Sequence, residues 1–98
     1  MVMIRHAALF RLKHAMGSAA EAAFLKAADV LAAIPGVQNF EKQRQVSSKN
    51  EFSFCFAMEF ENQEAYDFYN HHPDHVAFVR DFWVPEVDAF LEVDTVKI

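Results

Sequence analysis

The chain has 98 residues, of which 53% are hydrophobic, and a formal net charge of −5. Residues 1–98 suit a single domain with a sizeable apolar core, to which eleven phenylalanines contribute, and this composition excludes a disordered chain. The lysines and arginines form no basic stripe and no apolar run reaches about eighteen residues, so we expect neither nucleic-acid binding nor a membrane span.

The first part of the chain predicts a strand followed by a helix. Residues 3–13, "MIRHAALFRLK", alternate between two faces, as in a strand. One of these faces carries Ile4, His6, Ala8, Phe10 and Leu12. A helix is predicted over residues 19–34, because Ser18 and Glu21 fit a capping box at its start and Pro35 follows its end. Its apolar stripe would be Phe24, Ala28, Leu31 and Ile34, which recur at helical spacing.

Two further strands are predicted in the middle of the chain. Residues 37–46 are extended in character but mostly polar, which is typical of an edge strand. Residues 52–60, "FSFCFAMEF", place four phenylalanines and a methionine on one face, which is typical of a central strand.

The C-terminal third predicts helices and a last strand. Residues 62–70 form one predicted helix, and a further helical piece begins at Pro73 and runs to about Phe82. A short turn around Pro85 then leads into a predicted final strand, "FLEVDTVKI", over residues 90–98.

The order strand–helix–strand–strand–helix–strand predicts an α+β protein with the ferredoxin-like split βαβ fold. Its four-stranded antiparallel sheet would have helices on one face only, and no second layer remains in the chain for the other face. That other face would carry Ala7, Leu9, Cys55 and Ala57. A homodimer that packs sheet against sheet would bury these side chains, so we expect the chain to pair with itself.

The cellular compartment is predicted from the start of the chain and its cysteine content. Arg5 follows only four residues, and no apolar stretch typical of a secretory leader comes after it. The single cysteine, Cys55, cannot form an internal disulfide. These features predict a cytoplasmic protein.

The stretch "YNHHPDH" holds three of the five histidines and first suggests a metal site. His71 and His75 have the spacing of a zinc pair on one face of a helix. However, Pro73 would break that helix, and the glutamate that zinc proteases use is absent from the motif. We therefore predict no metal ligands here.

Pro73 instead fits the first position of a helix, which would place His75 in the first turn. In the simplest interpretation His75 only caps or packs there. In the functional interpretation the helix N-terminus keeps His75 neutral, and it acts as a general base beside an apolar pocket. Tyr69 would direct its hydroxyl into the same pocket, and His6 would lie on the pocket side of the first strand.

Aromatic and small residues are the candidate walls of this pocket. The predicted lining residues are Ala8, Phe10, Phe24, Ala27, Phe54, Phe56 and Trp83. The aromatic members would serve equally well as ordinary core, whereas small residues such as Ala8, Ala23 and Ala27 would leave a cavity between helix and sheet.

Four blocks of the chain, "IRHAALFRLK", "AAIPGV", "FSFCFAMEFENQEAYDFY" and "HPDHVAFV", resemble in this order the stress-responsive dimeric α/β-barrel family, abbreviated Dabb. The resemblance covers residues 3–95. It implies a ferredoxin-like subunit whose sheet meets that of its twin to form a dimeric α/β barrel. Most such proteins have no established activity.

One branch of this family, olivetolic acid cyclase, is a cofactor-free polyketide cyclase. The resemblance implies that His75 corresponds to its base, Tyr69 to the tyrosine that assists, and His6 to a histidine of its pocket. Ala23 and Ala27 depart from the larger aromatic residues expected in that branch, which puts the cyclase's own substrate in doubt.

The sequence thus predicts a homodimeric Dabb protein of uncertain activity. Its candidate chemistry is acid–base catalysis without any cofactor, similar to that of a cyclase, on a small aromatic or polyketide-like molecule. Two alternatives stay open: a non-enzymatic stable dimer or binding protein, and a cofactor-free monooxygenase of the related ferredoxin-like type.

Overall fold

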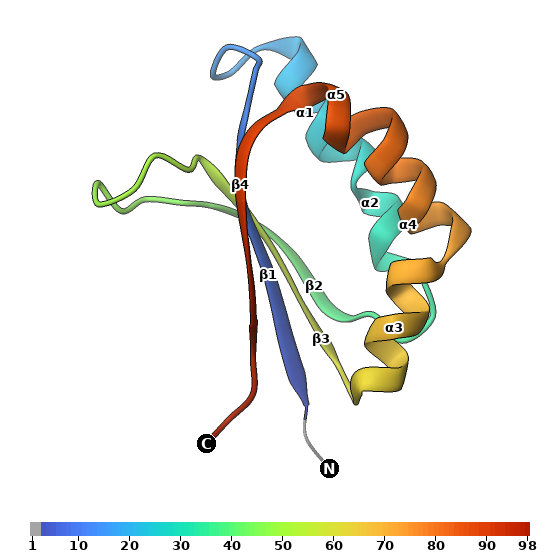
Figure 1. The fold of residues 1–98 in the computed structure, drawn as a ribbon. Coiled ribbons are helices and arrows are strands. Elements are labelled where there is room, and N and C mark those ends of the chain that lie inside the picture. Colours follow the sequence, from blue (N-terminus) through green and yellow to red (C-terminus); the bar gives the residue numbers. More distant parts are fainter. Residues whose placement is uncertain (1–2) are drawn as a thin grey trace.

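The computed structural model describes residues 3–98, which form one antiparallel sheet with helices on one face (Figure 1). The strands are β1 (Ile4–Leu12), β2 (Gln38–Arg44), β3 (Phe54–Phe60) and β4 (Val87–Thr95). The helices are α1 (Ala19–Ala27), α2 (Asp29–Ala32), α3 (Gln63–His71), α4 (Pro73–Phe78) and α5 (Val84–Glu86), and a π-helical turn, Val79–Trp83, joins α4 to α5. The strand order β2-β3-β1-β4 confirms the predicted ferredoxin-like fold.

The core lies between the sheet and the helices. The predicted alternation of the first strand is confirmed, because every second residue of β1, beginning at Ile4, is buried. Phe10, Phe56 and Phe60 of the two central strands are at most 2% exposed.

No helix in residues 3–98 has the length and apolar character needed to cross a membrane.

The single helix predicted over residues 19–34 is wrong in its extent, since the structure divides it at Ala28 into α1 and α2. After Ala28 the chain tightens into turns in which an amide bonds three residues back, as in Leu31 N to Ala28 O at 3.0 Å. The predicted buried stripe is nevertheless present: Phe24, Ala28, Leu31 and Ile34 all lie in the core. Periodicity therefore identified the apolar face but not the break.

The turn predicted around Pro85 and the strand predicted over residues 90–98 are also corrected. Helical structure continues through Pro85, and β4 begins at Val87, which pairs with Leu12. The π-helical turn explains this continuity, because the Val84 amide donates to Val79 O, five residues back. This wider turn reduces the clash of a proline ring with the carbonyl four residues before it.

The position of β2 at the edge of the sheet agrees with its polar sequence. Pairing between β2 and β3 shifts in register between Gln38 and Glu41, and Asn39 in this bulge has a φ of 52°. β3 is central, as predicted.

The sheet face away from the helices has no covering layer in residues 3–98 (Figure 1). Ala7 of β1 pairs with Ala57 of β3 on one side and with Val93 of β4 on the other. Leu9 of β1 pairs in the same way with Cys55 and Leu91. Leu91 and Val93 are 51% and 37% exposed. This face therefore carries an apolar stripe whose β4 side, Leu91 and Val93, is open to water in an isolated chain, whereas Ala57 of β3 is already buried.

Candidate active site

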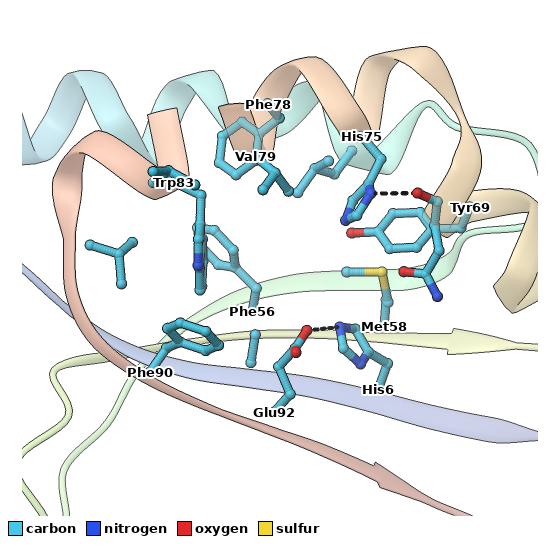
Figure 2. A pocket seen from close by; sticks show the side chains of 15 residues that line it. His6, Phe56, Met58, Tyr69, His75, Phe78, Val79, Trp83, Phe90 and Glu92 are labelled. Carbon is cyan, nitrogen blue, oxygen red and sulfur yellow. Dashed lines mark hydrogen bonds and ion pairs between the residues drawn. The ribbon is translucent and has the colours of Figure 1, made fainter. Parts of the chain in front are cut away.

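A cavity of about 540 Å³ lies between the sheet and the layer formed by α3, α4 and the π-helical turn (Figure 2). Its walls are His6, Ala8, Leu31, Phe56, Met58, Tyr69, Asn70, His75, Phe78, Val79, Trp83, Val84, Val87, Phe90 and Glu92. Most of these side chains are apolar, and the polar ones gather at the end where α3 meets α4 (Figure 2).

The strand register explains the shape of the floor. Ala8 of β1 pairs with Phe56 on one side and Glu92 on the other, and His6 pairs with Met58 and Asp94 in the same way. Residues paired directly across a sheet point to the same face. The small Ala8 therefore leaves a depression between larger neighbours.

The junction of α3 and α4 positions His75. His72 is extended, with φ −64° and ψ 136°, and Pro73 is the first residue of α4, as the sequence predicted. His75 Nδ1 lies 3.1 Å from Asn70 O. Because a carbonyl oxygen only accepts, Nδ1 carries the hydrogen and Nε2 of the neutral ring keeps its lone pair. Burial lowers the pKa of His75 below its ordinary value of 6.5.

Tyr69, near the end of α3, lies against His75. The two ring centroids are 4.4 Å apart, and Tyr69 is 2% exposed. Figure 2 shows its hydroxyl directed into the cavity, and within residues 3–98 this hydroxyl has no hydrogen-bond partner. Burial raises the pKa of Tyr69, so the phenol stays protonated and able to donate to a bound molecule.

His6 is buried on the cavity floor and held by a polar cluster. Its Nδ1 lies 2.6 Å from Asp94 Oδ1, and the Tyr66 hydroxyl lies 2.9 Å from Asp94 Oδ2 and 3.0 Å from His6 Nδ1. His6 Nε2 faces Glu92 Oε1 at 3.9 Å. Burial raises the pKa of Tyr66, and the nearby Asp94 carboxylate raises it further. Asp94 and Tyr66 thus fix the orientation of the His6 ring.

The structure brings together all three predicted polar residues, His75, Tyr69 and His6, around one cavity. Of the predicted lining residues, Ala8, Phe56 and Trp83 line it as well. Four predicted lining residues do not: Phe10, Phe24, Ala27 and Phe54. Phe10 and Phe24 are fully buried core, Phe54 packs beneath Arg44, and Ala27 packs against the core from α1.

The β4 side of the cavity was not predicted from the sequence. Phe90, Glu92 and Asp94 alternate along the strand, and β1 pairing directs them to the helix-covered face opposite Phe10, Ala8 and His6. Alternation in "FLEVDT" was the available signal. Two carboxylates on the same face as a phenylalanine, however, are more typical of a solvated edge strand, so the pattern did not suggest a cavity wall.

The other two histidines of the motif are not among the walls of this cavity. His71 Nδ1 bonds to Asp67 O at 2.8 Å, and His72 Nδ1 accepts from the Asp74 amide at 3.1 Å as the cap of α4. No group of three or more His, Cys, Asp or Glu in residues 3–98 is arranged to hold a metal ion.

We therefore expect purified protein to carry no stoichiometric zinc, and a chelator should leave its melting temperature unchanged, because residues 3–98 form no cluster suited to a metal ion. Elemental analysis and thermal unfolding with and without chelator measure both quantities. One metal per chain that is lost in His71→Ala or His75→Ala would contradict the expectation.

The arrangement of the cavity permits proton transfer. It combines a neutral imidazole nitrogen, a protonated phenol and a second, oriented imidazole with walls that are mostly apolar. Such a site can take a proton from a bound carbon or hydroxyl acid and donate a hydrogen bond to the oxygen on which charge develops.

Comparison with known proteins identifies similar chains. The family model described as Stress responsive A/B Barrel Domain (Dabb) matches residues 4–97. A crystal structure of a Dabb family protein with a ferredoxin-like fold from Mesorhizobium loti is 56% identical, with a TM-score of 0.97, and the match covers 100% of this chain and 99% of that one. No curated protein matches the chain significantly.

Two more distant structures share the fold alone. A dimeric ferredoxin-like protein of unknown function from Thermobifida fusca is 23% identical, with a TM-score of 0.81 over 98% of this chain and 92% of that one. A hydroxynitrile lyase from Passiflora edulis is 13% identical, with a TM-score of 0.84 over 98% and 94% of the two chains.

Proposed function

The chain belongs to the stress-responsive A/B barrel (Dabb) family, and from this premise we propose that it is an enzyme that performs acid–base chemistry without a cofactor. Its substrate would be a small aromatic or polyketide-like carbonyl compound bound in the cavity above β1. His75 would be the general base, Tyr69 the hydrogen-bond donor to the substrate oxygen, and His6 a positioning contact on the floor.

The observation that carries this proposal is the hydrogen bond from His75 Nδ1 to Asn70 O. It fixes the tautomer, so that Nε2 is the basic nitrogen, and the ring lies within the cavity wall (Figure 2). Burial also keeps the pKa of His75 low, so the imidazole is unprotonated at neutral pH and ready to accept a proton.

The proposed reaction begins when Nε2 of His75 removes a proton next to a substrate carbonyl. Negative charge then develops on the carbonyl oxygen, and the Tyr69 hydroxyl stabilises it by donating a hydrogen bond. The resulting enolate can attack a second carbonyl of the same molecule, after which the imidazolium of His75 returns the proton. This sequence is an intramolecular aldol closure, as in a cyclase.

We also propose that two copies associate through the apolar stripe of the sheet. The stripe carries Leu9, Leu91 and Val93, and the Thermobifida fusca neighbour is itself described as dimeric.

A binding protein without catalysis is the competing proposal for the function of the cavity. It predicts that ligands bind but that no proton is transferred.

A probe that needs only one base in an apolar pocket distinguishes the two proposals. 5-Nitrobenzisoxazole is a small neutral aromatic compound that opens to a coloured cyanophenolate when a base removes the C–H proton of its isoxazole ring and the N–O bond breaks. Wild-type protein should accelerate this opening well above the rate of free imidazole at equal concentration, since the cavity holds base and probe together. A rate no higher than that of free imidazole would favour the binding protein.

Tyr69→Phe should lower this rate about tenfold, which is less than the roughly 10²- to 10³-fold that a donor in a full oxyanion hole contributes. The ring and its contact with His75 remain in this variant, so its folding should be unchanged. Steady-state absorbance of the product measures the rate. Tyr66→Phe is the comparison variant: Tyr66 is not among the cavity walls and acts on the site only through its bonds to His6 and Asp94, so its loss should cost less. If Tyr66→Phe lowered the rate more than Tyr69→Phe did, Tyr69 would not be the hydrogen-bond donor.

A further inference from the structure

The charges around the cavity are of one sign. Glu92 lines it with a side chain that is 59% exposed, and the carboxylate of Asp94, two residues on, is 44% exposed behind His6. Whichever protonation state His6 holds, two carboxylates face at most one imidazolium. The polar end of the cavity therefore has a net negative charge.

No cation in the described chain offsets this charge from within the walls. The lining residues include neither lysine nor arginine. Arg80 borders an adjoining groove, but both its Nε and its Nη2 are bonded to Asp81, at 2.8 and 3.0 Å. A carboxylate or phosphate on a ligand would thus meet Glu92 with no lysine or arginine in the walls to offset the repulsion.

Glu92 has spare hydrogen-bonding capacity toward the cavity. Its ion-pair partner within residues 3–98 is His6 Nε2, at 3.9 Å, which is beyond hydrogen-bond distance. An ionised carboxylate accepts hydrogen bonds and donates none. Beside it, Phe90 and Trp83 pack edge to face with centroids 5.6 Å apart and form an aromatic wall (Figure 2).

We propose that Glu92 is a specificity-determining residue that selects uncharged, hydroxyl-bearing ring compounds and rejects their carboxylates. A phenolic hydroxyl donates to the Glu92 carboxylate while the ring packs on Phe90 and Trp83. This inference rests on the proposed use of the cavity as a small-molecule site, and it narrows the substrate to uncharged carbonyl compounds that also carry a phenolic or enolic hydroxyl.

The test compares 2,4-dihydroxybenzoate with its methyl ester at pH 7. Both have the same ring and hydroxyls, but only the acid is ionised. Trp83 is the sole tryptophan of the chain, so its indole N–H signal in a ¹H–¹⁵N NMR titration reports on the cavity wall. Wild type should bind the ester about tenfold more tightly than the acid, because like charges a few ångströms apart repel even where water screens them.

Glu92→Gln should remove most of this preference. It raises the affinity for the acid about tenfold and leaves that for the ester within about threefold, since the amide oxygen still accepts a hydrogen bond. The exposed Glu61→Gln is the matched control and should keep the wild-type preference, although it changes the net charge equally. Circular dichroism confirms that each variant is folded.

The outcomes separate this inference from the proposed function. Equal affinity of wild type for acid and ester, or an unchanged preference in Glu92→Gln, overturns the role of Glu92 while the cavity remains a binding site. Failure of both compounds to shift the Trp83 signal overturns the small-molecule site itself, and this inference with it.

Discussion

Replacing His75 by alanine should lower the rate of proton abstraction from 5-nitrobenzisoxazole by about 10²- to 10⁴-fold, the usual contribution of a positioned general base. The neutral tautomer of His75 leaves Nε2 free to accept a proton, and burial lowers the pKa of the ring. Absorbance of the phenolate product, followed at saturating and limiting probe, measures the loss in kcat and in kcat/KM.

Two controls make this result specific. His71→Ala removes an exposed histidine four residues earlier, outside the cavity walls, and should leave the rate unchanged. Thermal unfolding should show that His75→Ala keeps its fold, because the half-buried ring lies at the cavity wall rather than in the core cluster. A His75→Ala variant that is folded and as active as wild type would remove His75 from the proposed chemistry.

Replacing Leu91 by lysine should convert the protein from a dimer to a monomer. Leu91 lies on the open face of the sheet beside Leu9 and is half exposed in the isolated chain, so a lysine there leaves the subunit intact. In a sheet-to-sheet interface of about 1,000 Å² or more, the same lysine would be buried without a partner. Sedimentation velocity at micromolar concentration measures the change.

Val30→Lys is the matched control for this experiment. Val30 lies on α2, away from the sheet, and is 40% exposed. The same substitution there should leave sedimentation unchanged. Wild-type protein that sediments as a monomer, or a Leu91→Lys variant that remains dimeric, would contradict a dimer built on this face.

Most of the fold was predictable because its signals are local. The alternation of β1 and β3 and the proline that opens α4 were all legible in the sequence. The break at Ala28 was not, because Phe24, Ala28, Leu31 and Ile34 keep helical spacing through it. The turn predicted around Pro85 was wrong because a π-helical turn, which has no simple sequence signature, lets the helix continue past the proline.

The candidate site was half predictable. His75 and Tyr69 lie close in sequence, and Pro73 fixes their relation, so local rules brought them together. The pairing of His6 with Asp94 joins residues 88 positions apart, and it depends on the exact register of β1 against β4. A shift of one residue would turn Glu92 and Asp94 to the open face, and sequence patterns do not fix register that finely.

The pH dependence of the probe reaction tests the central claim most directly. A general base works only when unprotonated, so the rate should fall as the pH decreases through the pKa of His75. Burial places that pKa below 6.5, and the plateau of kcat/KM should therefore extend to below pH 6.5. The account predicts this profile in wild type and its disappearance in His75→Ala. A midpoint at or above 6.5, or the same profile in both proteins, would contradict it.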